Sequence, residues 1–212
     1  MKKNPELITL KPIEVKTATV FIEGDGDLVL CKTNAYNTRA LMADDRGQIR
    51  QVPNHWEDII TAIHWRDGIP AKDTYKECSE EMLHQMLRDN APCITAFGLK
   101  KSFGQAVVRN EIDKYATKFD NAVNVVADKG LVPVEFSEWS LDERLMSPKR
   151  GAPVTVRISH FSGWRAHFRI DYTDHVYSLE QIVNIINLAG FGLGIGSGRS
   201  SGFGRYHVTD VK

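Results

Sequence analysis

The stretch that decides how this chain folds runs from Gly190 to Gly204 and reads GFGLGIGSGRSSGFG. Seven of its fifteen residues are glycine, the residue that adopts positive φ angles without steric cost and lets a second backbone approach closely. The conformation of the backbone, more than any pattern of apolar side chains, therefore determines the shape of this segment.

The flanking residues indicate a helix before the glycine-rich stretch and a strand after it. Ser178 has Gln181 three residues later, a capping-box spacing, and apolar residues at helical spacing follow, so we expect a helix over 178–189 that Gly190 ends. Residues 203–208 are expected to form a closing strand. Standard phosphate loops run from strand to glycine loop to helix, with a G-x-G-x-x-G or P-loop spacing that is absent here, so nucleotide binding of either kind is not expected.

The glycine-rich stretch also contains serine hydroxyls and two cations, which suit an anion. Backbone N–H groups in successive turns form anion-binding concavities, and arginine pairs with phosphate through its planar fork. The alternative is a tight structural connection whose arginines are only solvated. We favour a polyanion, with these residues as candidate contacts: Gly194, Gly196, Gly198, Arg199 and Arg205.

Charge and cysteine content restrict the class of protein. The 27 Lys and Arg residues balance the 27 Asp and Glu residues, but the part of the chain from residue 149 onward carries a net charge of +4 and the preceding part −4. Such asymmetry indicates a local basic site. Three widely separated cysteines without a C-x-x-C motif argue against structural zinc or disulfides and favour a reducing cytosol, and no signal peptide or membrane span is recognisable.

The remaining pattern predicts an α+β fold with a ferredoxin-like β-α-β-β-α-β core. We expect strands at 13–22, near 123–136, at 164–172 and at 203–208, with helices over 102–118 and 179–189. Ser102 and Gln105 are expected to cap the first of these helices. Its buried face is expected to contain Val108, Ile112, Tyr115, Ala116 and Phe119. The whole chain, 1–212, would form a single domain with its core at about 8–23 and 98–212, and residues 24–97 would form an inserted helical subdomain after the first strand.

Residues 178–208 resemble the C-terminal end of the RAMP superfamily, which comprises CRISPR-associated, ferredoxin-like RNA-binding proteins. The match includes Trp164 in a strand, Glu180-Gln181-Ile182 in the helix and Ala189-Gly190-Phe191-Gly192 at the loop. Within this superfamily, the stretch is most similar to RAMP-like proteins encoded by phages and prophages. The resemblance implies binding of RNA and assembly of subunits side by side.

Three further groups of cations are candidate phosphate contacts. Arg165 and Arg169 alternate with apolar residues on the clearest strand, so they share its polar face with His167. Lys100 and Lys101 are placed by the pattern at the start of a helix, where free N–H groups favour phosphate. Lys149 and Arg150 lie in a long charged loop. RAMP backbone subunits have, in the corresponding region, an inserted hairpin that wedges against the bound RNA, so the resemblance implies a similar role for this loop.

These observations lead to three hypotheses, none of which requires a metal or a cofactor. The first is a non-catalytic protein that binds single-stranded nucleic acid, RNA more than DNA, as a homo-oligomer or as a subunit of a nucleoprotein complex in the cytoplasm of a bacterial or phage-infected bacterial cell. The second is a metal-independent endoribonuclease, for which His160 and His167 are the candidate catalytic residues. The third is a phage protein that binds a host protein in such a complex.

Overall fold

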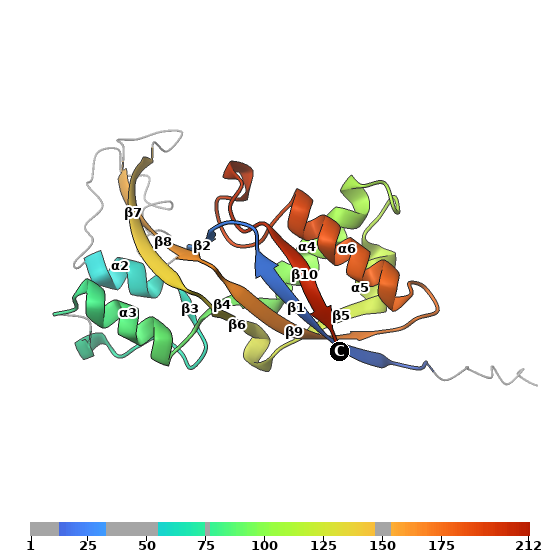
Figure 1. The fold of residues 1–212 in the computed structure, drawn as a ribbon, viewed down its shortest axis with the longest axis horizontal. Coiled ribbons are helices and arrows are strands. Elements are labelled where there is room, and N and C mark those ends of the chain that lie inside the picture. The colour runs from blue at the N-terminus through green and yellow to red at the C-terminus, as the bar shows by residue number, and fades with distance from the viewer. Residues whose placement is uncertain (1–12, 33–54, 75–76, 147–153) are drawn as a thin grey trace, which may run out of the picture.

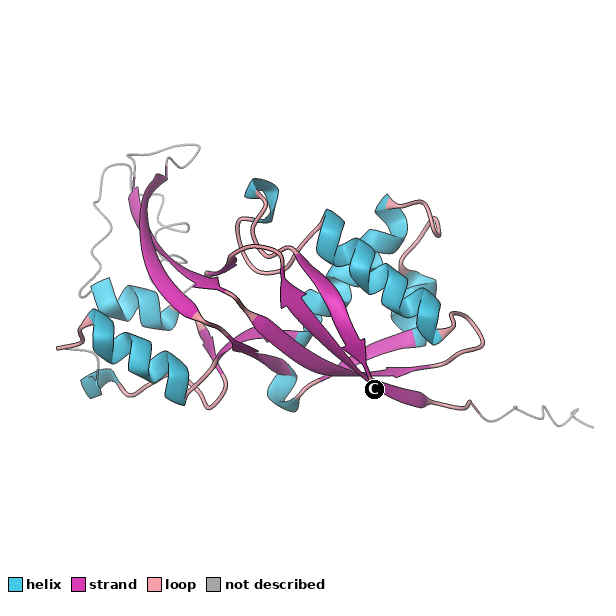
Figure 2. Ribbon diagram, viewed as in Figure 1, coloured by secondary structure: helices cyan, strands magenta, loops and turns pink. Residues whose placement is uncertain are grey.

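The computed structural model describes residues 13–32, 55–74, 77–146 and 154–212, which form two antiparallel sheets and several helices (Figures 1 and 2). The larger sheet has seven strands, in the order β10-β1-β9-β6-β4-β3, with β5 pairing with β9 beside β6. The smaller sheet has the order β2-β8-β7. The expected mixed α+β fold with an antiparallel sheet is therefore observed.

The bounds of the elements are as follows. The larger sheet contains β1 (Lys16–Gly24), β3 (His64–Trp65), β4 (Pro92–Thr95), β5 (Val123–Val126), β6 (Leu131–Glu135), β9 (Arg165–Tyr172) and β10 (Tyr206–Val211). The smaller sheet contains β2 (Leu28–Leu30), β7 (Glu138–Met146) and β8 (Val154–Ser162). The helices are α2 (His55–Thr61), α3 (Glu80–Asp89), α4 (Ala96–Arg109), α5 (Thr117–Ala122) and α6 (Leu179–Gly192), and single 3₁₀ turns are η1 (Lys72–Thr74), η2 (Asp128–Gly130) and η3 (Arg199–Ser201).

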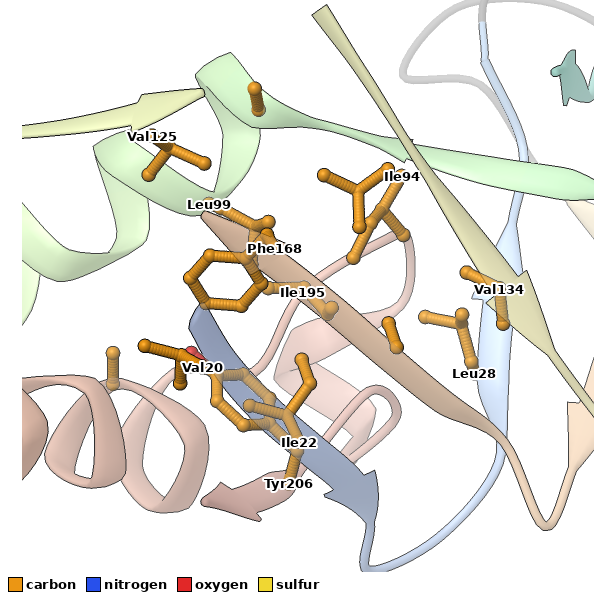
Figure 3. Packing of buried hydrophobic residues seen from close by; sticks show 14 of the residues in the cluster. Val20, Ile22, Leu28, Ile94, Leu99, Val125, Val134, Phe168, Ile195 and Tyr206 are labelled. Carbon is orange, nitrogen blue, oxygen red and sulfur yellow. The ribbon is translucent and has the colours of Figure 1, made fainter. Parts of the chain in front are cut away.

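The side chains of strand β9 alternate between a buried and an exposed face of the larger sheet. Ala166, Phe168 and Ile170 point into the core, whereas the alternate residues are exposed. Phe168 packs against Phe103 of α4, with ring centroids 5.9 Å apart. Figure 3 shows Phe168 among Val20, Leu99 and Tyr206, side chains that come from both the sheet and the helices. One face of the sheet is thus covered by helices, and among the described residues the other face is open.

Helix α6 begins as the sequence predicts but ends three residues later, at Gly192. Ser178 is its N-cap and forms a complete capping box with Gln181, whose backbone N–H donates to the serine hydroxyl over 3.2 Å. Gly190 lies inside the helix. The position requires glycine because a Cβ there would collide with the carbonyl oxygen of Tyr206 in β10. The glycine permits close packing of the helix on the strand, and the prediction that it ends the helix is wrong.

Helix α4 differs more from the expectation. It begins at Ala96, where the Thr95 hydroxyl accepts a hydrogen bond from the Gly98 N–H over 3.0 Å. Ser102, predicted as the cap, is buried within the helix and donates to the carbonyl of Leu99. Of the residues predicted to form the buried face, Val108 is 42%, Ile112 43% and Tyr115 62% exposed, whereas Phe119 is fully buried. The helix ends at Arg109, so these residues do not share one helical face.

The range predicted as a helical insertion, 24–97, contributes strands as well as helices. Residues of this range form α2 and α3, but also β2 of the smaller sheet and β3 and β4 of the larger one. In Figure 1, α2 and α3 lie near the β7–β8 hairpin at the left, whereas α4, α5 and α6 lie at the other end of the molecule. Within the described ranges, no helix is long and apolar enough to cross a membrane.

Candidate nucleic-acid interface

The open face of the larger sheet displays the polar residues of β9 beside those of β1. The antiparallel register places Thr19 opposite Arg169, Phe21 opposite His167 and Glu23 opposite Arg165. Arg165, His167 and Arg169 are all exposed. The structure therefore brings together on one surface the β9 residues that the sequence pattern assigns to a single strand face.

An aromatic pair lies at the centre of this face. The imidazole of His167 stacks on the ring of Phe21, with centroids 5.4 Å apart and planes inclined by 25°. The ammonium group of Lys212, next to β10, lies 4.8 Å from the centroid of the same phenyl ring. We call these three residues, together with Arg165 and Arg169, the sheet-face platform. It combines flat rings with cations, the two features that bind bases and phosphates of single strands.

The cations of the sheet-face platform are paired with carboxylates, a feature that the prediction of a basic face did not include. Arg165 Nη2 lies 3.1 Å from Glu23 Oε1, and Arg169 Nε lies 3.4 Å from Asp171 Oδ1. Lys212 Nζ likewise lies 3.2 Å from Asp210 Oδ2. Such exposed pairs contribute only about 0–1 kcal/mol each. The guanidinium groups can therefore exchange a carboxylate for a phosphate at little cost.

A hollow of about 320 Å³ adjoins the sheet-face platform. Strand β5 pairs with residues 169–172 of β9 and β6 pairs with residues 165–166, while the segment between them leaves the sheet through η2. The hollow lies at this departure, and His167 and Arg169 line it together with Arg66 from the end of β3.

The glycine-rich stretch is bound tightly to the turn after β1 and to β2. The Gly204 N–H donates to the Asp27 carbonyl and the Ser197 N–H to the Val29 carbonyl, both over 2.8 Å. A Cβ at Gly196 would lie 2.5 Å from the Val29 oxygen, and a Cβ at Gly194 would lie 2.8 Å from the Gly204 oxygen. These glycines permit close backbone packing, so several amides expected to bind an anion are already bonded to carbonyls.

The two arginines of the stretch differ in their surroundings. Arg205 donates from Nη1 to the Phe191 carbonyl over 2.6 Å, which places its charge at the C-terminus of α6. Arg199 is exposed in η3. Gly198, at a φ of 66°, precedes this turn, and a Cβ there would meet the ring of Phe203 at 2.8 Å. Arg205 thus has a structural partner, whereas Arg199 is exposed to solvent.

The lysines predicted at a helix start lie within α4 instead. Because α4 begins at Ala96, Lys100 and Lys101 are in its second turn, away from the free N–H groups. Lys101 Nζ lies 5.8 Å from the ring centroid of the exposed Phe97, and Lys100 Nζ lies 3.4 Å from Asn124 Oδ1. Lys149 and Arg150 fall outside the residues that the structure describes.

The two candidate catalytic histidines occupy opposite environments. His160 is buried on β8, where its Nδ1 lies 3.4 Å from Asp27 Oδ2 and its Nε2 lies 3.7 Å from Asp142 Oδ2. The ring of Phe203 packs edge-on against it at 5.0 Å. His167 is exposed on the sheet-face platform. Of the two, His167 is the histidine that a bound strand can reach.

Sequence reasoning missed three residues of this surface: Phe21, Lys212 and Arg66. The alternation of residues 13–22 was available as a signal for Phe21, because it assigns Phe21 to the same side of the strand as Thr17 and Thr19. Lys212 and Arg66 carry no comparable signal, since their positions depend on how β10 and β3 join the sheet.

No protein-family model and no curated protein matches this sequence. Among solved structures, this chain is similar to a chain in the cryo-EM structure of the Type III-B Cmr-beta bound to cognate target RNA. The match has 12% identity and a TM-score of 0.49, and covers 93% of this chain and 60% of that chain. This chain is also similar to Cmr6 from Pyrococcus furiosus, with 11% identity and a TM-score of 0.37, over 92% of this chain and 98% of that one.

Proposed function

We propose that this chain is a RAMP-like protein with a ferredoxin-like core. It binds single-stranded nucleic acid on the sheet-face platform, and it prefers RNA to DNA. It binds the nucleic acid without cleaving it. The β-α-β-β-α-β succession of β1, α4, β5, β9, α6 and β10 supports the fold proposed here. Residues 24–97 would be an insertion into this single domain. Origin in a phage or prophage and assembly with further copies in a nucleoprotein complex belong to the same proposal.

The observation that carries this proposal is the stacked pair of Phe21 and His167. Helices cover one face of the larger sheet, and Phe21 and His167 lie on the opposite face. Their rings offer a flat apolar surface along which a single-stranded nucleic acid could cross the sheet. A base stacked on such a ring contributes about 1–3 kcal/mol of binding free energy, largely irrespective of its sequence. Arg165 and Arg169 flank His167 at alternate positions of β9, where phosphates on either side of a stacked base would lie.

The binding experiment is a fluorescence-anisotropy titration of a fluorescein-labelled, mixed-sequence 20-nucleotide RNA, with the DNA of the same sequence for comparison. With about 3–5 phosphates neutralised, log K is expected to fall with log salt at a slope of about −0.7 per phosphate. Absence of binding at low salt, or an affinity that does not respond to salt, contradicts the proposal. Gel analysis of the same RNA after incubation in EDTA must show it intact, because cleavage that is lost in His167→Ala would indicate an endoribonuclease instead.

A further inference from the structure

The hollow beside the sheet-face platform arises from the way two short strands share one neighbour. Strands β5 and β6 both pair with β9, and the connection between them leaves the sheet at Ala127 and returns at Leu131. Lys129 and Gly130 in this connection have positive φ angles of 51° and 70°, which turn the chain sharply. The hollow therefore belongs to the sheet itself and is formed by backbone geometry.

Its lining is mainly apolar and includes several polar groups. Val126, Ala127, Leu131 and Pro133 contribute the apolar walls. Arg66, His167, Arg169 and Asp128 contribute the polar groups. At about 320 Å³ the hollow lies at the lower end of the roughly 300–1,000 Å³ typical of ligand sites, a size suited to one small ring system.

The charges at the hollow favour a neutral ligand with polar edges over a free anion. Arg66 is held by Asp67, with Nη2 2.8 Å from Oδ2, and donates to the Asp89 carbonyl. Asp128 adds a carboxylate to the lining. Donors on arginine and acceptors on a carboxylate are the groups that pair with the edges of nucleobases.

His167 connects the hollow to the stacked pair. Its imidazole stacks on Phe21 and also lines the hollow. A nucleic-acid strand with one base on Phe21 would therefore pass directly beside the hollow. We infer that the hollow receives one unstacked nucleobase of the bound strand, with its ring against the apolar walls and its polar edge toward Arg66 and Asp128. This inference rests on the proposed function and identifies a base-binding site within it.

The test is photo-crosslinking of the full chain to single-stranded RNA that contains 4-thiouridine in place of uridine, followed by mass spectrometry of tryptic peptides. The apolar walls of the hollow lie in the peptides 119–129 and 130–144. The peptide 17–32 contains Phe21 together with Thr19, which also lines the hollow, so fragment spectra that locate the crosslinked residue distinguish the two sites. Val126→Phe fills the hollow, and Val108→Phe makes the same change on the exposed end of α4 as a matched control. Arg66→Ala, with Arg88→Ala as its control, removes a polar group without adding volume.

The expected result is a crosslink in the peptides 119–129 or 130–144 that disappears in Val126→Phe and weakens in Arg66→Ala, while a crosslink located at Phe21 persists. The affinity of Val126→Phe for the RNA should fall about tenfold, as expected for one lost base contact, and neither control should change it. RNA that binds and crosslinks only outside those two peptides, or a crosslink there that survives both variants, overturns the base-binding hollow alone. RNA that neither binds nor crosslinks overturns the proposed function and the base-binding hollow together.

Discussion

Gly190 of α6 lies directly against the carbonyl oxygen of Tyr206 in β10, so that even a methyl group at this position would collide with the strand. The contact holds the last helix on the edge of the larger sheet. It also explains why glycine stands within a helix, where it is ordinarily unfavourable by about 1 kcal/mol relative to alanine.

Replacement of Gly190 by alanine is expected to destabilise the fold by about 1–3 kcal/mol, because the added methyl group has no space between helix and strand. Gly192→Ala is the matched control, since a Cβ there meets nothing within 4 Å and alanine favours the helix. Urea denaturation followed by circular dichroism measures both. Equal stability of the two variants would show that the helix does not pack on β10 at this distance.

Trp164 is expected to contribute more to stability through its indole N–H than Trp139 does. Trp164 Nε1 donates to the Gly26 carbonyl over 2.8 Å, and the ring covers Gly24 at the end of β1. The Trp139 Nε1, in contrast, is buried without a hydrogen-bond partner among the described residues. Trp164→Phe should therefore lose about 1–2 kcal/mol more than Trp139→Phe in thermal or urea unfolding. The opposite order would contradict the hydrogen bond.

Arg205 should behave as a structural residue. Its bond to the Phe191 carbonyl places a cation at the C-terminus of α6, where the helix dipole favours it. We expect Arg205→Gln to cost about 1–2 kcal/mol of unfolding free energy and to leave the affinity for RNA within about twofold. If Arg205→Gln weakened RNA binding and left the stability unchanged, Arg205 would be a phosphate contact, as predicted from the sequence, and not a structural residue.

The stability of the protein should decline in alkali partly through Cys93. Burial raises the pKa of this thiol from 9.0 to about 11, so the folded state disfavours the thiolate. A raised pKa in the folded state gives stability that is complete below pH 9 and is lost as the pH rises toward 11. The unfolding midpoint measured from pH 8 to pH 11 should therefore fall less steeply in Cys93→Ala than in the unmodified protein. Identical slopes would contradict the burial of an ionisable thiol at this position.

The sequence predicted those elements whose local signals agree with their tertiary surroundings. Strand β9 alternates in the sequence as it does in the sheet, and the capping box at Ser178 sets the start of α6. Both signals are local, since one depends on alternate residues and the other on a spacing of three.

The errors arose where distant contacts decide the structure. Ser102 has a cap-like spacing to Gln105, but the helix begins earlier because Thr95 caps it at the end of β4. The close packing of the glycines after α6 was likewise not predicted, because their neighbours Val29 and Gly204 belong to segments whose approach no local pattern encodes. The pairing of Arg165 with Glu23 likewise depends on the register of β1 and β9.

The decisive measurement is the affinity of single-stranded RNA for the double variant Phe21→Ala/His167→Ala, determined by fluorescence anisotropy beside the unmodified protein. Arg88→Ala/Arg109→Ala, which changes two exposed arginines of α3 and α4, serves as the control. If the strand stacks on the sheet-face platform, the double variant should bind at least about tenfold more weakly, with an unchanged circular dichroism spectrum, and the control should retain its affinity. If the double variant binds as tightly as the unmodified protein, the open face of the sheet is not the binding surface.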